Sequence, residues 1–251
     1  MNNENSKVKS LAKALHVLEC FSNDKPELGV TEISKMLHLQ KSTVHNIVST
    51  YKDLGYLQQN PETGKYHLGI KLLQFSYIIN NHMGLRKFFL PYLQEIANKV
   101  NETVYLGIPH DGDVMYIENQ APFNSVSTRN ILGEHAPMYC TGLGKVMLAY
   151  LPDADRESAM DRPFFPFTEN TITTREALLA ELGEIRRRGY AIDNMEHEYG
   201  VMCLAFPVFG VDGRIVAAVS TSAPSLRFTP EVIKQNAIVM REILAPAQHI
   251  L

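Results

Sequence analysis

The sequence has few cysteines, no long apolar run and no excess of positive charge, and each absence excludes a class of protein. Cys20, Cys140 and Cys203 are far apart and form no C-x-x-C pair, which argues against a disulfide framework or a cysteine-based zinc site. The most apolar stretches are about half the length of the roughly 20 residues that a membrane span requires. The polar N-terminus does not read as a secretory signal. We therefore expect a cytoplasmic protein with no membrane role, no metal and no cofactor.

The composition indicates a folded protein of one large or two small domains. The 251 residues are 45% apolar and 20% charged, close to the average of globular proteins. There are 24 Lys and Arg residues and 27 Asp and Glu residues, so the chain as a whole has no positive field that would attract nucleic acid. Any DNA-binding site must therefore be a local patch.

The first third of the chain has the order of elements of a winged helix-turn-helix domain. Apolar residues at helical spacing predict a helix over 11–21, a short second helix with Thr31 as its N-cap, and a third helix over 40–54 that ends at Gly55. Strand-like runs over 56–59 and 65–68 flank a turn and predict a hairpin. In this arrangement the third helix can enter the major groove of DNA while the hairpin lies along the backbone.

The outer face predicted for the third helix suits contacts with DNA. Gln and Asn side chains can pair with adenine, a lysine can reach guanine or phosphate, and hydroxyl groups suit phosphate oxygens. The predicted DNA contacts are Gln40, Lys41, Ser42, Thr43, His45, Asn46 and, from the hairpin, Lys65. Residues 1–70 contain eight lysines and seven acidic residues, so charge supports this prediction only weakly. A winged helix that contacts protein is the alternative.

The rest of the chain predicts a linker helix and a larger α+β domain. The run 69–84 is apolar on more than one side, which predicts a helix that packs against another subunit or, alternatively, against its own second domain. Further helices are expected over 85–100, 141–151, 174–188 and 230–248, and antiparallel strands over 103–108, 114–117, 190–194, 201–209 and 215–222. A loop-rich segment over 121–137 includes a short strand near 125–129, and the proline-containing segment between 151 and 174 has no expected element. The expected domains are a winged helix-turn-helix in 1–68, a linker helix in 69–84 and an antiparallel sheet with packed helices in 85–251.

Two groups of residues in the second domain predict a small-molecule pocket. Gly142-Leu143-Gly144-Lys145 fails the spacing of a phosphate-binding loop, but the helix that it opens presents backbone amides that suit a small anion such as a carboxylate. Ser220 and Ser222 share one face of a strand, and Asp193 and Cys203 lie on neighbouring strands. The alternative is a half-exposed strand face with a small buried cysteine. Catalysis has little support, since the sequence has no G-x-S-x-G motif and no histidine pattern of a metal site.

In this order and spacing the chain resembles the IclR family of bacterial transcriptional regulators over nearly its whole length. The resemblance lies first in the stretches 10–11, 14–18, 39–45 (L-Q-K-S-T-V-H) and 55–57. In the second domain it lies in 141–149 (T-G-L-G-K-V-M-L-A), 189–193 (G-Y-A-I-D), 198–205 (E-Y-G-V-M-C-L-A), 207–209 and 212–220 (D-G-R-I-V-A-A-V-S). Each stretch alone is only weak support for the resemblance, but their combination is specific to the family.

The resemblance implies an N-terminal winged helix, a linker helix and a GAF-like effector domain that act as a homodimer or homotetramer on palindromic double-stranded DNA operators. It also implies a pocket for a small organic acid or related metabolite. By position, the pocket residues are Thr141, Gly142, Leu143, Asp193, Cys203, Ser220 and Ser222. The expected protein is a regulator without enzymatic activity.

The resemblance leaves the ligand and the sign of regulation open. A repressor of a catabolic operon that ligand releases is the leading expectation, a ligand-dependent activator is the alternative, and an enzyme with a protein-contact winged helix is a distant one. Tyr199, Met202 and the pair Tyr139-Cys140 depart from the usual family pattern. The ligand is therefore expected among small keto acids or among bulkier, aromatic or sugar acids.

Overall fold

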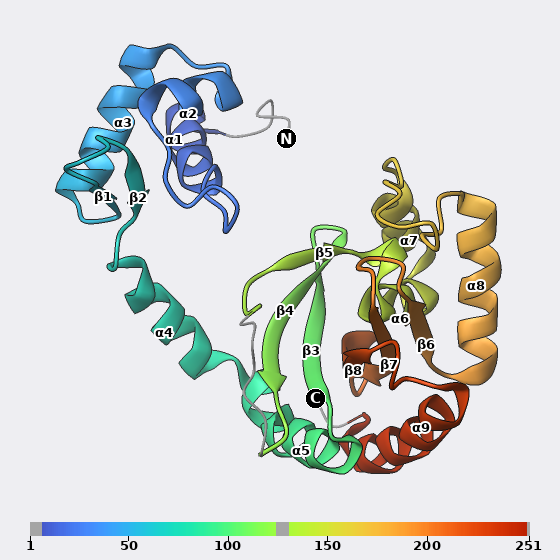
Figure 1. The fold of residues 1–251 in the computed structure, drawn as a ribbon. Helices are drawn as coiled ribbons and strands as arrows, with labels where there is room; N and C mark the ends of the chain where they lie inside the picture. Colours follow the sequence, from blue (N-terminus) through green and yellow to red (C-terminus); the bar gives the residue numbers. More distant parts are fainter. Residues whose placement is uncertain (1–6, 124–130, 250–251) are drawn as a thin grey trace. The chain divides into compact units, whose positions relative to one another are not determined.

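The structure, a computed structural model, describes residues 7–123 and 131–249, so the strand expected near 125–129 lies outside the described residues. The chain divides into two compact units, residues 1–83 and residues 84–251 (Figure 1). In the described part of the chain no helix is long and apolar enough to cross a membrane.

The N-terminal unit is a winged helix followed by one further helix. Its elements are α1 (Lys9–Glu19), α2 (Val30–Leu37), α3 (Lys41–Asp53), β1 (Leu57–Gln59), β2 (Tyr66–Leu68) and α4 (Leu72–His82). β1 and β2 pair antiparallel, and Leu28 extends the pairing through two backbone hydrogen bonds to Tyr66. The side chains of Val17, Ile33 and Val44, one from each of the first three helices, are fully buried. The predicted three helices and hairpin are therefore confirmed.

Local signals set the helix ends in this unit, with one correction. α3 ends where the sequence predicts, because Gly55 adopts a left-handed φ of 82°. The predicted N-cap at Thr31 is wrong, since α2 begins at Val30 and its N-cap is Gly29. The Gly29 N–H donates to the Glu32 carboxylate at 2.7 Å. An acidic side chain three residues into the helix thus caps it in place of a hydroxyl.

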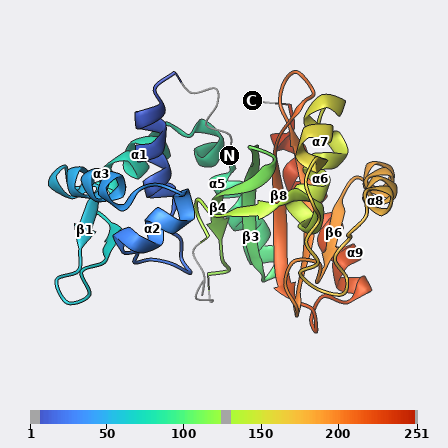
Figure 2. The ribbon, with the colours of Figure 1, turned by 90° about the horizontal axis from the view of Figure 1, so that it is seen from above.

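The C-terminal unit is a six-stranded antiparallel sheet with helices packed on it, which confirms the predicted α+β fold. The strands are β3 (Thr103–His110), β4 (Asp113–Gln120), β5 (His135–Pro137), β6 (Ala191–Asn194), β7 (Val201–Phe209) and β8 (Ile215–Pro224). The sheet order is β5-β4-β3-β8-β7-β6, with β4, β3 and β8 side by side in Figure 2. The β3–β4 turn has positive φ at Asp111 and Gly112, as a tight hairpin requires.

The helices of this unit cover the sheet on both sides. They are α5 (Gly84–Val100), α6 (Gly142–Tyr150), α7 (Asp153–Met160), α8 (Arg175–Arg188) and α9 (Pro230–Leu244), with 3-10 turns η2 (Met138–Cys140) and η3 (Ala245–Ala247). α5 contacts α9, β3 and β4, whereas α6 contacts α8 and strands β6, β7 and β8 (Figure 1). Thr174 and Thr229, the N-caps of α8 and α9, both accept a backbone N–H through their side chains. α7 falls in a segment where the sequence predicted no element, and β5 falls in the segment 121–137, where the sequence predicted a strand only near 125–129.

Gly144 allows α6 to lie against the turn η2. A Cβ atom on Gly144 would be 2.2 Å from the Cα of Met138, a distance that no packed structure tolerates. The second glycine of the G-L-G-K motif is therefore needed for close backbone packing. This packing fixes the start of α6 in place.

Replacing Gly144 with alanine is expected to destabilise the protein by about 1–3 kcal/mol, because the added methyl group forces α6 away from η2. The measurement is the free energy of unfolding in urea. Gly183→Ala is the matched control, since this α8 glycine has no neighbour within 4 Å of an added Cβ. That variant should gain up to about 1 kcal/mol from helix propensity alone. Equal effects at the two positions would contradict the packing role.

Candidate functional sites

The outer face of α3 brings six of the seven predicted DNA-contact residues together. These six residues are all exposed: Gln40, Lys41, Ser42, Thr43, His45 and Asn46. On the opposite side Val44 and Val48 are fully buried, so the hydrophobic core fixes the direction in which the polar face points. The first turn of α3 contains no acidic residue. The partial positive charge of the helix N-terminus therefore adds to the charge of Lys41.

The seventh predicted residue, Lys65, lies in the hairpin, and its side chain is bound to another residue of the protein. Lys65 is half-exposed, and its ammonium group lies 3.0 Å from the Glu32 carboxylate on α2. A contact between Lys65 and DNA would require the lysine to exchange this partner. Lys52, near the end of α3, donates to the Gln59 amide at 2.9 Å and ties the helix to β1. Sequence reasoning did not single out either contact, because each joins residues of different elements.

The second site is a cavity of about 150 Å³ at the start of α6 in the C-terminal unit. All seven residues that the sequence predicted for a pocket line it: Thr141, Gly142, Leu143, Asp193, Cys203, Ser220 and Ser222. Sheet register explains the convergence, because Asp193 pairs with Cys203 on β7 and Cys203 pairs with Ser222 on β8. Three neighbouring strands thus place one polar row below the helix.

The start of α6 forms the other side of the cavity. Thr141 is the N-cap: its hydroxyl accepts the Gly144 N–H at 3.1 Å and donates to the Pro137 carbonyl at 3.0 Å. A Cβ on Gly142 would lie 3.4 Å from the Cβ atoms of Cys203 and Ala205, so the helix start sits directly on β7. Because Thr141 accepts the Gly144 N–H, the first-turn donors that the helix itself does not use are the N–H groups of Gly142 and Leu143, two residues of the cavity lining.

Sequence reasoning missed nine residues of the cavity lining. They are Tyr105, Tyr116, Ile131, Glu134, His135, Ala136, His197, Glu198 and Val201. Tyr105 pairs directly with Ser220 across β3 and β8, so the order of the strands would have identified it. The order of the strands in the sheet depends on pairing between residues far apart in the sequence, which no local pattern predicts. Among the described residues, no group of three or more His, Cys, Asp and Glu side chains is arranged to hold a metal ion.

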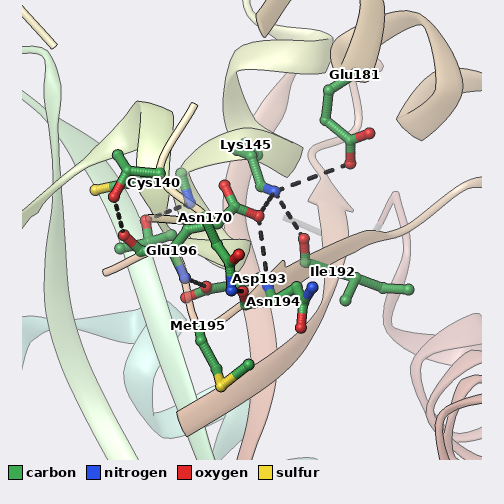
Figure 3. Close-up of polar contacts among 12 residues, drawn as sticks. Cys140, Lys145, Asn170, Glu181, Ile192, Asp193, Asn194, Met195 and Glu196 are labelled. Atoms are coloured by element: carbon green, nitrogen blue, oxygen red, sulfur yellow. Dashed lines mark hydrogen bonds and ion pairs between the residues drawn. The ribbon is translucent and has the colours of Figure 1, made fainter. Parts of the chain in front are cut away.

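A buried ion pair lies next to the cavity (Figure 3). Lys145, on α6, is 1% exposed, and its ammonium group contacts the Glu196 carboxylate and donates to the Ile192 carbonyl at 2.7 Å. Glu181 of α8 lies 3.9 Å from the same ammonium group and 2.7 Å from Arg188. Lys145 thereby joins α6 to the end of β6.

The loop that follows β6 is fixed by hydrogen bonds from the segment 168–171. The hydroxyl groups of Thr168 and Thr171 each donate at 2.6 Å, to the carbonyls of Met195 and Glu196 respectively. Asn170 donates to the Asn194 carbonyl at 3.0 Å (Figure 3). These contacts hold the loop that supplies His197 and Glu198 to the cavity.

Burial shifts the protonation of several groups at the cavity. It raises the pKa of the Asp193 carboxyl from 3.8 to about 7, against the opposing effect of the Glu196 N–H, which donates to it at 2.8 Å. Burial also raises the pKa of Glu196, while Lys145 opposes that shift. The pKa values of the Cys140 and Cys203 thiols lie well above their usual range for the same reason. Both thiols are therefore neutral near pH 7, and neither is an activated nucleophile.

Comparison with known proteins identifies the family. The family model described as "Bacterial transcriptional regulator IclR C-terminal" matches residues 78–250, and the model described as "IclR helix-turn-helix domain" matches residues 10–61. The chain belongs to the IclR family. It is 34% identical to the HTH-type transcriptional regulator XynR of Escherichia coli over 221 residues, which cover 88% of each chain. It is 32% identical to KdgR of the same organism over 234 residues, or 93% of this chain and 89% of KdgR.

Solved structures of the IclR family share the fold. The crystal structure of Thermotoga maritima IclR has a TM-score of 0.69 and 29% identity, covering 93% of this chain and 95% of that protein. An IclR homologue of Microbacterium hydrocarbonoxydans, complexed with 4-hydroxybenzoate, has a TM-score of 0.74 and 24% identity, covering 94% and 99%. The protein is thus a helix-turn-helix transcriptional regulator of the IclR family.

The raised pKa of Asp193 predicts a specific dependence of stability on pH. The folded protein keeps this proton up to about pH 7 and the unfolded chain loses it near pH 3.8, so stability falls as pH rises between these values. From pH 5.5 to 8.5 the expected loss from Asp193 is about 2 kcal/mol. Urea unfolding at both pH values, for wild type and Asp193→Asn, isolates this loss from histidine titration. An identical pH dependence in both proteins would contradict the assignment.

Proposed function

We propose that the protein is a one-component regulator in which residues 1–68 bind operator DNA, 69–84 form the linker and 85–251 bind a small carboxylate effector. The observation that carries the proposal is the cavity at the start of α6, which joins backbone N–H groups to a row of hydroxyl side chains. The chain belongs to a family of transcriptional regulators, so the proposed result of effector binding is a change in transcription. Repression relieved by the effector is the leading version, and activation by the effector is the alternative.

The N-terminal unit supports binding of double-stranded DNA through α3. Six exposed hydrogen-bonding residues, 40–43, 45 and 46, lie on one face near the helix N-terminus. Arrangements of this kind suit a recognition helix whose first residues contact base edges while hydroxyl groups and lysine contact phosphates. Lys65 is a weaker member of the proposed interface, because its ammonium group binds Glu32.

The cavity supports a small acid as the effector. Its volume of about 150 Å³ is similar to that of an engineered protein cavity that accommodates benzene. Ser220, 3% exposed, lines the cavity opposite the N–H groups of α6, and such N–H groups favour an anion. The proposed contacts are Thr141, Gly142, Leu143, Asp193, Cys203, Ser220 and Ser222. The size favours keto, aromatic or short sugar acids over larger metabolites.

The linker region supports assembly into a homodimer or homotetramer. Ile70, Leu73, Tyr77 and Ile79 are more than half exposed on or beside α4. A row of large apolar side chains of this kind marks an interaction surface in an otherwise globular chain. A dimer would hold two copies of α3 for two half-sites of a palindromic operator. We propose a second copy of the chain as the partner of this surface.

An enzymatic role has weaker support than a regulatory one. The relatives are regulators, and the candidate nucleophile Cys203 is neutral because burial raises its pKa. We therefore propose a cytoplasmic, non-enzymatic protein that needs no cofactor. Turnover of a metabolite by purified protein, lost in Cys203→Ala or Ser220→Ala, would overturn this view.

Lys41→Ala is expected to weaken operator binding and to reduce the slope of log affinity against log salt by about one, because one phosphate contact is lost. The measurement is fluorescence anisotropy on the protein's own upstream DNA at several salt concentrations. Lys99→Ala is the charge-matched control, since Lys99 is exposed on α5 in the other unit. An unchanged slope for Lys41→Ala would remove this residue from the interface.

Ser220→Ala is expected to leave DNA binding intact and to weaken effector binding by about tenfold, the effect of one lost hydrogen bond. Pyruvate, 4-hydroxybenzoate and D-gluconate serve as probes of the three acid classes, with calorimetry and release of DNA as readouts. Thr221→Val is the control, because Thr221 is fully buried beside Ser220 on the same strand and its hydroxyl has no hydrogen-bond partner. Full binding and response in Ser220→Ala would place the effector elsewhere.

A further inference from the structure

Two buried carboxylates lie beside the cavity, and only one of them is paired with a cation. Two carboxylates, Asp193 and Glu196, are each 5% exposed and lie three residues apart. The buried cation beside them, Lys145, binds Glu196 (Figure 3). Asp193 instead accepts the Glu196 N–H at 2.8 Å. Glu196 therefore has a cationic partner, and Asp193, which faces the cavity, has a hydrogen bond from the backbone.

The described part of the cavity lining contains no side chain with a permanent positive charge. Among the described residues that line it, none is Lys or Arg, while Asp193, Glu134 and Glu198 are acidic. A ligand carboxylate that binds at the start of α6 comes close to Asp193, since a Cβ added to Gly142 would lie 3.7 Å from the Cβ of Asp193 and both residues line the cavity. Two carboxylates this close cannot both stay ionised in a buried site, and one of them retains a proton.

We propose that Asp193 binds the effector carboxylate as a neutral acid and shares its proton with it in an O–H···O⁻ hydrogen bond. The proposal rests on the effector pocket proposed above and adds its selectivity. When Asp193 is ionised beforehand, a hydronium ion of the solvent gives up a proton, so one O–H bond breaks in the solvent and one forms on the carboxylate pair. No bond between heavy atoms changes, and the bound pair carries one negative charge. The N–H groups of α6 and the Ser220 hydroxyl stabilise that charge.

The surroundings of Asp193 favour this protonation. Among the described residues, the titratable and charged groups that face it or line the same cavity are Lys145, Glu196, His197, Glu198, Cys140, Cys203, Tyr105, Tyr116, Glu134 and His135. Glu181 and Arg188 lie beyond Lys145. Lys145 and Arg188 are engaged with Glu196 and Glu181, and burial keeps the two thiols and Tyr116 neutral through raised pKa values. Burial is the main cause that raises the pKa of Asp193 to about 7, and the charge of Glu196 also raises it, while the Glu196 N–H and Lys145 oppose the shift.

The arrangement selects for ligand class. A monocarboxylate accepts the proton of Asp193 and adds a single negative charge. A phosphate ester brings two negative charges at pH 7 and more oxygen atoms than the small cavity suits. A neutral polyol supplies no charge for the N–H groups of α6. Carboxylates should therefore bind, and phosphorylated or neutral analogues of the same size should not.

The test is calorimetric titration of the full-length wild-type protein with pyruvate, 4-hydroxybenzoate and D-gluconate at pH 6.0 and 8.5. Each titration is made in two buffers of different ionisation enthalpy, which reports the number of protons taken up. The expected uptake is close to one proton per site at pH 8.5 and close to zero at pH 6.0. Affinity should fall about tenfold per pH unit above pH 7.

Three variants and one control assign the proton to a residue. Asp193→Asn keeps a donor group, so it should still bind the probe without proton uptake and with one affinity at both pH values. Asp212→Asn, in the exposed β7–β8 turn, is the control and should behave as wild type. The lining histidines provide the competing explanation. Uptake that persists in Asp193→Asn and disappears in His135→Asn or His197→Asn would overturn the proposal.

The wild-type titrations keep the proposal falsifiable even if Asp193→Asn fails to fold. Binding of a probe at pH 8.5 without proton uptake would overturn the role of Asp193 and leave the effector pocket intact. Failure of all three acids to bind at either pH would instead contradict the carboxylate pocket on which the inference rests. D-Glucitol and glycerol 3-phosphate should not bind, and binding of either with the affinity of an acid would contradict the stated selectivity.

Discussion

The contact between Lys145 and Glu196 is the interaction on which the geometry of the pocket depends. Lys145 lies one turn into α6, and Glu196 belongs to the loop that continues from β6. An intact buried ion pair adds little net stability, because the cost of removing both charges from water offsets their attraction. Loss of one partner costs typically about 3–5 kcal/mol, since the other charge stays buried alone. The pair therefore acts chiefly to fix one loop against one helix.

The same contact determines the electrostatics of the cavity. Lys145 is bound to Glu196, and among the described residues that line the cavity none is a lysine or an arginine. Attraction for an anion then comes from oriented N–H groups and hydroxyl groups, which are fixed before the ligand arrives. On α3 the N-terminus of the helix is exposed to water and Lys41 supplies a full charge. In the proposed function, two helix starts would therefore serve two chemistries, one buried and selective for its ligand and one solvated and sensitive to salt.

Most of the fold was predictable from sequence because its signals are local. Gly55, Gly189 and the pair Asp111-Gly112 all adopt the positive φ that the sequence pattern requires, and Thr174 and Thr229 cap the expected helices. α7 was missed because its sequence is almost entirely polar and the flanking prolines suggested a loop. β5 was missed because a three-residue strand is stable only through its pairing with β4. The N-cap of α2 was misplaced because Thr31 is a more common capping residue than Gly29.

The pocket was predictable only in part, for a related reason. Strand periodicity places Ser220 and Ser222 on one face, but Tyr105 joins them only through the order of strands β3 and β8. The burial of Lys145 depends on Glu196, 51 residues further along the chain, and no local pattern announces that contact. Lysine and glutamate in a helix and a loop normally indicate solvent exposure. Long-range pairing therefore decides both what lines the cavity and what charge it carries.

The response to an effector is limited by a simple thermodynamic relation. A ligand changes DNA affinity only by the ratio of its affinities for the two states of the regulator, typically a coupling of about 1–3 kcal/mol. A cavity whose walls are joined by Lys145–Glu196 and by the hydrogen bonds of Thr168 and Thr171 deforms little on its own. Differential affinity must then arise where the surroundings are less constrained, and the exposed apolar side chains of α4 form such a region. In a dimer, a rigid pocket would bind the effector, and an adaptable linker helix would transmit the effect of binding to the DNA-binding domain. Changes in α4 should therefore alter the coupling between effector and DNA while leaving the affinity of the isolated pocket for the effector unchanged.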